Sequence, residues 1–405
     1  MTGLGAVSPW GWGSEALHQG LLSGRSAIDL PQKFDVEGHR TRRMGEVPEA
    51  PAELGAAFHQ WARWTRAEQF ALGAAREAVT MAGLSFHQEK PNPNVGVFFG
   101  GSTAGMDEAE HFFRRVMDQE DGRPWIAFLA AHQLNGPGDA VARHLGLGGP
   151  VETFSAACAS GGLALAAALE ALRDGEVDMA LAGGADALCQ LTCSGFNSLR
   201  AVDEDNCLPF RAERRGLNIG EGAGVLVLER LSHARQRNAR PLARLLGSGT
   251  SCDAHHMTSP HPQGEGAARA IQLALEDAHL SPEDVSFVNA HGTGTPQNDA
   301  AEWLALERVF GDRSRQLPVT SNKGAVGHLL GSSGALEAVA TVLALDHHTI
   351  HPTPGPGPPD PKLGVDLVLR EARPLTGPAV AISTSFAFGG ANAALALGSP
   401  PPEST

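Results

Sequence analysis

A single cysteine, Cys158, stands at a change of pattern in the segment FSAACASGGLALAAALEALRD, residues 154–174. Before it, Val151, Thr153 and Phe154 are β-branched or aromatic, which predicts a short strand. After it, leucines and alanines cover nearly every side of a helix, which predicts that the helix is buried. The cysteine is therefore expected in a tight turn at a helix start, where unpaired backbone N–H groups favour an anion.

The residues around Cys158 share a small side chain: they are Ala157, Ala159, Ser160, Gly161 and Gly162. Such a turn lets another chain or a ligand approach the sulfur closely. A cysteine at a helix start is also expected to have a lowered pKa and a larger thiolate fraction, as a covalent catalyst requires. Because free cysteines are often simply small buried hydrophobes, the rest of the chain has to decide between a nucleophile and a structural residue.

A histidine, His291, opens the glycine-rich turn in NAHGTGTPQNDAAE, residues 289–302. The helix that starts after this turn carries Asp299 and Glu302, and acids in a first helical turn stabilise the helix without any further function. That argument does not explain His291. Two hydroxyl groups of the same turn either bind a polar ligand or cap the turn, and they belong to Thr293 and Thr295.

A second histidine, His328, lies in TSNKGAVGHLLGSSGALEAVATVLA, residues 320–344, between Lys323 and Glu337 and just before a buried helix. A lone histidine in such a place is more often structural. Two histidines in glycine-rich turns, together with a cysteine at a helix start, form a recognisable chemical set.

Helical patterns alternate with short apolar strands along the whole chain, which predicts an α/β fold with mostly buried strands. The segment ARQRNARPLARLLGSG near residues 235–250 leads from one set of strands to the next, so we expect two parts, 1–245 and 246–405. Residues 351–364 are proline-rich and predict a loop. VETFSAAC and VSFVNAH each end a strand at a candidate catalytic residue, and duplication of the two parts is a hypothesis.

The formal net charge of -14 argues against nonspecific binding to nucleic acid. We find neither a signal peptide nor a membrane span in the sequence. The five cysteines are an odd number without an export signal, which favours reduced thiols and a cytoplasmic protein. Cys189 and Cys193 form one C-x-x-x-C without a second pair, so a metal is not expected.

The ordered set of Cys158, HGTGTP and KGAVGHLLGSSG resembles the decarboxylating β-ketoacyl-acyl carrier protein synthases, the elongating condensing enzymes of the thiolase-like superfamily. The resemblance runs from TGLGAVSP at Thr2 to SFAFGGANAAL and so covers nearly the whole chain. It implies a five-layered αβαβα fold of two related halves, with Cys158 from the first half and both histidines from the second at one buried site. It also favours a homodimer, with a heterodimer as an alternative.

The resemblance implies that Cys158 takes an acyl group from a carrier-protein or coenzyme A thioester while backbone N–H groups of Cys158 and Phe388 hold the oxyanion. Nε2 of His291 and of His328 would then stabilise the malonyl thioester as it loses carbon dioxide, and the resulting carbanion attacks the acyl group. The remaining roles are support of the second histidine by Lys323 and Glu337, and binding of the phosphopantetheine arm of the substrate by Thr293 and Thr295. No cofactor of the protein is implied.

The presence of a second histidine in VGHLLG points to elongation, because the initiating relatives that resemble this fold use one histidine and an asparagine. The alternative is a non-elongating partner subunit of a ketosynthase heterodimer that binds carrier protein. Partner subunits of this kind usually lack the cysteine, whereas Cys158 is intact. Nucleotide binding through TGLGAV is a weaker alternative, since the spacing fails the dinucleotide pattern.

Three stretches depart from the family pattern. Almost nothing precedes TGLG, so the first strand is expected to be incomplete. LPFR, with Leu208 and Arg211, inverts the charges of the usual RPFD and removes an expected salt bridge or docking contact. Ala387 replaces a loop glycine that would adopt positive φ, which predicts a stiffer loop around Phe388.

Carrier proteins are acidic, and docking on this acidic chain therefore requires local positive charge. Arg63 and Arg66 in WARWTR are the principal candidates for docking. Five further arginines are alternatives, and each is equally well explained as a solvated surface residue: Arg40, Arg42, Arg43, Arg214 and Arg215.

Overall fold

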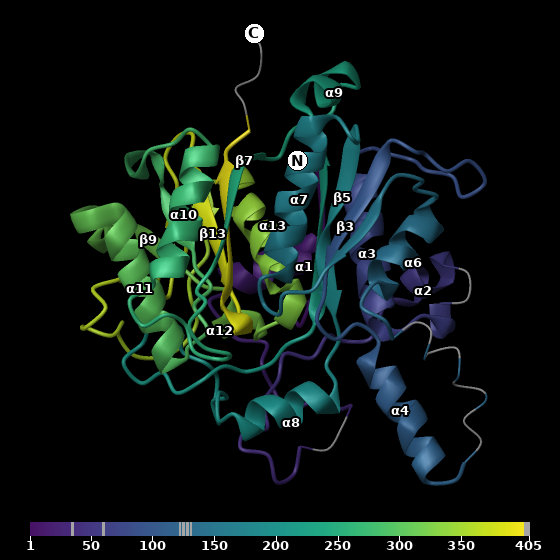
Figure 1. Cartoon of the computed structure of the whole chain (residues 1–405), viewed down its shortest axis with the longest axis horizontal. Helices are drawn as coiled ribbons and strands as arrows, with labels where there is room; N and C mark the ends of the chain where they lie inside the picture. Colours follow the sequence, from purple (N-terminus) through teal and green to yellow (C-terminus); the bar gives the residue numbers. More distant parts are fainter. Residues whose placement is uncertain are drawn as a thin grey trace.

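The computed structural model describes residues 1–33, 36–58, 61–120, 123, 126, 129 and 132–400. Two six-stranded sheets stand side by side, with helices between them and on both outer faces (Figure 1). The helix layers, in order across the molecule, are α3 (Arg66–Met81) with α6 (Gly136–Leu145), then α7 (Ser160–Asp174) with α13 (Ser333–Asp346), then α10 (Glu265–Asp277) with α11 (Pro296–Phe310). This is the five-layered αβαβα arrangement that the family resemblance implies.

The first sheet contains strands from the first part of the chain. Its order is β2 (Gly11–Trp12), β1 (Gly3–Ser8), β6 (Gly222–Glu229), β5 (Met179–Asp186), β3 (Val95–Gly100), β4 (Val151–Phe154). Helices cover both faces of this sheet, which explains why β5 is buried along its whole length. β1 is six residues long and pairs with β6 over five of them, from Gly3 with Val227 to Val7 with Ala223.

The second sheet has the order β11 (Asp366–Leu367), β9 (Pro318–Thr320), β8 (Phe287–Asn289), β13 (Val380–Phe386), β14 (Ala391–Gly398), β7 (Arg244–Cys252). In sequence order, β7 is the first of these strands. The division that we expect after residue 245 therefore falls inside β7, and it stays a prediction.

The remaining elements are shorter or lie around the two sheets. They are α1 (Ser14–Leu22), α2 (Ala52–Ala57), α4 (Met106–Met117), α8 (Gln190–Ser198), α9 (Leu231–Gln236), α12 (Lys323–Val326), β10 (Thr349–Ile350), β12 (Arg373–Pro374), and the 3₁₀ turns Trp61–Arg63, Pro282–Asp284, Gly311–Arg315, Leu330–Ser332 and Phe388–Gly390. Residues 351–364 form neither helix nor strand, as their prolines predict. None of the described helices is long and apolar enough to cross a membrane.

The two halves share one topology. When β2 and β11 are set aside, the orders β4-β3-β5-β6-β1 and β9-β8-β13-β14-β7 match strand for strand. The directions match as well, since the first two pairs are parallel and the last two antiparallel in each sheet. This supports duplication but corrects the expected correspondence, because β4 before Cys158 is equivalent to β9 before His328, whereas β8 before His291 is equivalent to β3.

The two helices of the middle layer, α7 and α13, approach each other at glycines. A Cβ at Gly161 would lie 2.7 Å from the backbone nitrogen of Ala335, and one at Gly334 would lie 2.8 Å from the nitrogen of Gly162. Real side chains do not tolerate such distances. The small residues after Cys158 therefore make room for α13, a helix of the same chain in which every residue from Ser333 to Leu345 is buried.

Candidate active site

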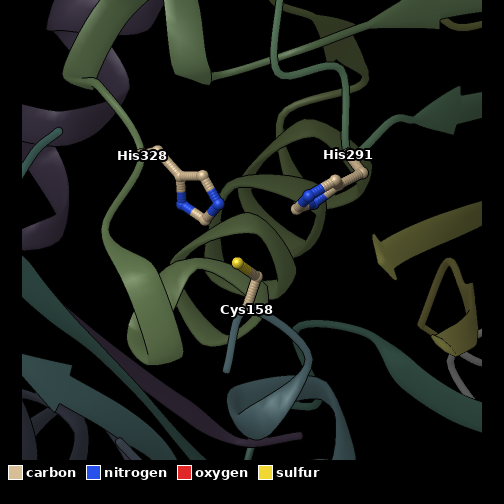
Figure 2. Close-up of side chains that lie close together, drawn as sticks. All are labelled: Cys158, His291 and His328. Carbon is tan, nitrogen blue, oxygen red and sulfur yellow. The ribbon is translucent and has the colours of Figure 1, made fainter. Parts of the chain in front are cut away.

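Cys158, His291 and His328 converge on one buried point (Figure 2). The sulfur and one ring nitrogen of each histidine lie within 4.8 Å of one another. The two imidazole rings are nearly perpendicular, with centroids 5.4 Å apart. Cys158 lies between β4 and the start of α7, His291 follows β8, and His328 follows α12, so the structure brings together the three residues that we singled out from the sequence.

A cavity of about 350 Å³ opens onto these three side chains. Two phenylalanines line it: Phe196 on α8 and Phe388 on the loop after β13, whose rings stack with centroids 5.7 Å apart. Thr293 and Thr295 line it as well, and their hydroxyl oxygens are 2.9 Å apart. The Asn298 N–H donates to Oγ1 of Thr295 at 3.3 Å, so Thr295 both caps α11 and faces the cavity.

The hydrogen bonds of His328 determine its tautomer. Its Nδ1 is 3.1 Å from the backbone nitrogen of Leu330 and 2.8 Å from Oγ of Ser333. A backbone N–H can only donate, so Nδ1 accepts and the ring proton of the neutral imidazole is on Nε2. His328 therefore presents an N–H donor.

His291 is arranged in the same way by a cation. Nζ of Lys323 lies 3.2 Å from Nδ1 of His291 and forms a buried ion pair with Glu337. An ammonium group only donates, so Nδ1 of His291 accepts and its Nε2 carries the proton. The expectation that Lys323 and Glu337 support the second histidine is wrong, because Lys323, paired with Glu337, contacts Nδ1 of His291 and not His328.

Burial, together with the positive charge of Lys323, lowers the pKa of both histidines well below the usual value of 6.5. Both rings are therefore neutral near pH 7. Figure 2 shows the rings turned towards the space next to the Cys158 sulfur. The site thus offers two neutral Nε2–H donors beside one thiol.

Burial raises the pKa of Cys158 to about 11, although the Lys323 charge and the backbone N–H groups of Phe388 and Cys158 act in the opposite direction. The expectation of a lowered pKa is therefore wrong, because removal from water outweighs the helix start. The same contacts place both backbone N–H groups at the sulfur, where an oxyanion formed on an attached acyl carbon would be within reach. Ala157, just before the cysteine, has φ of 47°, which is strained for alanine and marks the turn as tight.

A thiol and two imidazoles at such distances are also ligand types for zinc. A metal would need the lone pair of Nε2 and would move each ring proton to Nδ1. At both histidines Nδ1 faces a group that can only donate, the Leu330 N–H or the Lys323 ammonium. The surrounding hydrogen bonds therefore suit two N–H donors better than two metal ligands.

Glu302 is a residue whose importance was missed from the sequence. Its buried carboxylate accepts the N–H of His291 at 2.9 Å, the N–H of Gly292 at 2.8 Å and the hydroxyl of Thr384 at 2.8 Å. Burial raises the pKa of Glu302 to about 7 against these hydrogen bonds. The sequence did contain a signal for this role, because Glu302 is an acid on the helix that directly follows the loop with His291. We explained this acid by stabilisation of the helix alone.

Two departures from the family pattern have a structural explanation. Arg211 is buried and donates to the carbonyl of Thr353 at 3.1 Å, so it binds the proline-rich loop instead of a carboxylate. Ala387 has φ of -125°, and the positive φ values of its loop belong to Gly389 and Gly390, both at 83°. The reason given for a stiffer loop is therefore wrong for this conformation.

Arg66 is a structural residue and not a docking residue. Its guanidinium pairs at 2.6 Å with the fully buried Glu221 and also donates to the carbonyl of Val47. Arg63 and Arg42 are exposed, so docking by them stays a prediction. The other candidates have partners within the chain: Arg40 with Glu204, Arg43 with Asn206, Arg214 with Asp360, and Arg215 with Asp203 and Asp205.

The duplicated five-layered fold and the cysteine with two histidines define a condensing acyltransferase of the thiolase-like class. The model of the beta-ketoacyl synthase N-terminal domain matches residues 1–234, and that of the C-terminal domain matches residues 242–355. The chain belongs to the beta-ketoacyl synthase family.

Individual relatives match over almost the full length. The chain is 35% identical over 404 residues to the 3-oxoacyl-acyl-carrier-protein synthase 2 of Staphylococcus aureus, covering 98% of this chain and 99% of that protein. It is 38% identical over 415 residues to a putative polyketide beta-ketoacyl synthase 1 of Streptomyces cyaneus, covering 99% and 97%. Among solved structures, the ishigamide ketosynthase/chain length factor superposes with a TM-score of 0.91 at 35% identity, covering 99% and 98%.

Proposed function

We propose that this chain condenses an acyl group carried on Cys158 with malonyl-acyl carrier protein, giving 3-ketoacyl-acyl carrier protein and carbon dioxide. The single observation that carries the proposal is the pair of neutral Nε2–H donors of His291 and His328 next to a buried thiol. The names of the Staphylococcus aureus and Streptomyces cyaneus relatives agree with this reaction.

In the first step the sulfur of Cys158 attacks the carbonyl carbon of an acyl thioester. The N–H groups of Cys158 and Phe388 hold the oxyanion of the tetrahedral intermediate. The carrier thiol leaves and takes up the proton that Cys158 gives away, so the products are acyl-Cys158 and a free carrier thiol. Thr293 and Thr295 line the cavity, and in this proposal they bind amides of the phosphopantetheine arm, which belongs to the substrate.

In the second step malonyl thioester replaces the free carrier. The bond between its carboxylate and its methylene carbon breaks, carbon dioxide leaves, and the electron pair forms an enolate whose oxygen accepts from both Nε2–H groups. The methylene carbon then attacks the acyl carbonyl, and Cys158 leaves as a thiolate that is reprotonated from water.

Neutral histidines suit this step because the group to be stabilised is a developing oxyanion in a buried site. Burying two imidazolium ions there would carry a large desolvation cost. Removing one preorganised donor of this kind typically costs about 10²- to 10³-fold in rate, or about 3 to 4 kcal/mol. We place the reaction in the cytoplasm, where the five free thiols stay reduced.

The test is intact-protein mass spectrometry after incubation with acyl-carrier protein and then with malonyl-carrier protein. The wild-type protein gains the acyl mass and loses it to a 3-ketoacyl product. Cys158→Ala gains no acyl mass, whereas His328→Ala gains it but discharges it about 10²- to 10³-fold more slowly. An unmodified wild-type protein across several acyl lengths would overturn the proposal in favour of a non-elongating partner subunit.

We also propose that the active chain works in a dimer, either with itself or with a second chain of the same fold. The specific observation for the heterodimer is the superposition on a chain of the ishigamide ketosynthase/chain length factor. Native mass spectrometry of the purified chain distinguishes a homodimer from a monomer that lacks its partner.

A further inference from the structure

A second buried carboxylate, Asp186 at the end of β5, connects the two halves of the molecule. Its Oδ1 accepts the backbone N–H groups of Ser102 at 2.9 Å, Thr103 at 2.7 Å and Ala104 at 3.1 Å, all in the loop after β3. Its Oδ2 accepts the N–H of Gly331 at 2.7 Å, from the turn before α13, and shares the Ser102 N–H with Oδ1 at 3.0 Å. The first loop belongs to the half with Cys158, and the second follows His328.

The carboxylate of Asp186 faces backbone N–H groups and the Thr103 hydroxyl. The side chain is fully buried, and none of the described residues forms an ion pair with it. Burial raises the pKa of Asp186, and the N–H groups of Thr103, Ser102 and Ala104 together with the Thr103 hydroxyl act against this rise. Burying a carboxylate is costly unless its hydrogen bonds are made, and these hydrogen bonds are strongly directional. They therefore fix both loops relative to β5.

The Gly331 bond determines the geometry next to His328. Leu330, one residue earlier, has φ of 53°, a left-handed conformation that costs a leucine roughly 1 to 2 kcal/mol. In this conformation its N–H points at Nδ1 of His328. Gly331 itself has no room for a side chain, because a Cβ would lie 2.8 Å from Oδ2 of Asp186.

We infer that Asp186 is a positioning residue for His328: by holding the Gly331 N–H it keeps the strained Leu330 N–H on Nδ1 of that histidine, and so keeps the proton on Nε2. The inference rests on the proposed function, in which Nε2–H of His328 acts in the second step only. Asp186 in the first half of the chain would thus control the Nε2–H donor of His328 in the second half.

Cys158 does not depend on Asp186 in the same way. The loop held by Asp186 does touch the cysteine turn, because the Ser102 hydroxyl donates to the carbonyl of Ala157 at 3.2 Å. That carbonyl also accepts from the hydroxyl of Ser160 at 2.6 Å, so the turn has an anchor of its own. Loss of the Gly331 bond is therefore expected to affect the discharge of acyl-Cys158 much more than its formation.

Asp186→Asn is a selective way to remove that bond. The amide oxygen is expected at the Oδ1 position, where three backbone N–H groups converge, and the NH₂ group then faces the Gly331 N–H. Two donors repel each other, so the bond to Gly331 in the second half is lost, whereas the Ser102 N–H, which donates to both oxygens, keeps its bond of 2.9 Å at the Oδ1 position. Thr103→Val is the matched control, since it removes the hydroxyl bond at Oδ1 and leaves the Gly331 bond intact.

The experiment measures the rates of acylation and of malonyl-dependent discharge separately, by quenched-flow intact mass spectrometry. For Asp186→Asn we expect discharge to slow at least tenfold with little change in KM for malonyl-carrier protein, while acylation changes less than threefold. Thr103→Val should leave the ratio of the two rates unchanged. Adding Asp186→Asn to His328→Ala should change discharge less than threefold, because the residue through which it acts is gone.

Equal slowing of both steps by Asp186→Asn, or an undiminished effect in the His328→Ala background, would overturn the inference and leave a purely structural role. If Asp186→Asn lacks a cooperative thermal transition, Asp186→Glu replaces it, because this variant keeps the charge but moves it by one methylene. The same change in the ratio of discharge rate to acylation rate is expected for Asp186→Glu. A wild-type protein that is not acylated would overturn the proposed function and this inference together, whereas an active wild type with an unchanged ratio in the variant would overturn this inference alone.

Discussion

The two halves have the same strand order, yet the equivalent loops after β3 and after β8 are held in different ways. In the first half the loop after β3 is held by Asp186 from the end of the neighbouring strand β5. In the second half the equivalent loop after β8, with His291, is held mainly by Glu302 from helix α11, and the His291 N–H also donates to the hydroxyl of Thr384 on β13 at 2.9 Å. The end of β13, equivalent to the end of β5, carries Phe386 instead of an acid, and its ring lies 5.9 Å from that of His291.

This difference explains how one topology supplies two kinds of chemistry. Because α11 holds the histidine loop, the chain after β13 is free to continue to Phe388, whose N–H reaches Cys158. In the first half the corresponding strand end carries Asp186, whose carboxylate binds the loop after β3.

The largest expected effect separates the halves by their chemistry. Cys158→Ala should lower condensation on the order of 10⁶-fold, as for other covalent catalysts that lose their nucleophile. Decarboxylation of malonyl-carrier protein should persist, because the histidines of the second half are unchanged. Release of labelled carbon dioxide, measured beside ketoacyl product, checks both parts. Loss of decarboxylation together with condensation would mean that the two halves do not act separately.

A smaller effect tests the anchor of the second half by its pH dependence. The folded-state pKa of Glu302, about 7, lies above its usual value of 4.5, so its contribution to stability is fully present below pH 4.5 and is lost as the pH rises through 7. Glu302→Gln does not titrate. Its free energy of unfolding should therefore rise relative to that of the wild type by about 3 kcal/mol between pH 4.5 and pH 8.

Urea denaturation of the Glu302→Gln variant and the wild type at several pH values in this range measures that difference. Asp186 titrates in both proteins and cancels in the comparison. A difference in unfolding free energy that stays constant with pH would show that Glu302 remains ionised throughout.

The smallest expected effect concerns docking on the surface of the first half. Arg63→Glu should raise KM for acyl- and malonyl-carrier protein a few-fold, because rim charges mainly steer association, and should leave KM for coenzyme A substrates unchanged. Arg269→Glu is the matched control, an exposed arginine on α10 in the opposite outer layer of the second half. Equal effects of both variants, or equal effects on coenzyme A substrates, would remove Arg63 from the docking surface.

The fold and the three central residues could be predicted because their information is local. Cys158, His291 and His328 each lie in a short motif, and the alternation of helices and strands extends over the whole chain. The five layers follow from a resemblance that covers the same length. Such features can be recognised without knowing which segments contact one another in the folded chain.

The residues that were predicted wrongly depend on contacts between distant segments. Arg66 is structural because Glu221, 155 positions later, reaches it. Lys323, at the start of the short helix α12, contacts His291 and not His328, although His328 is nearer in the sequence. Burial by both halves raises the pKa of Cys158, which a motif at a helix start does not reveal. Asp186 ends the strand MALAGGAD, and an acid at the end of a buried strand was the only sign of its role.

The close approach of α7 and α13 at Gly161 and Gly334 also limits which substitutions this enzyme can accept. Substitution at Gly161 or Gly334 would push the two helices apart and separate the nucleophile from the helix that follows His328. These two positions are therefore closed to larger side chains. Adaptation to acyl groups of other lengths and shapes is left to residues that line the cavity itself, among them Phe196, Leu199 and Phe388.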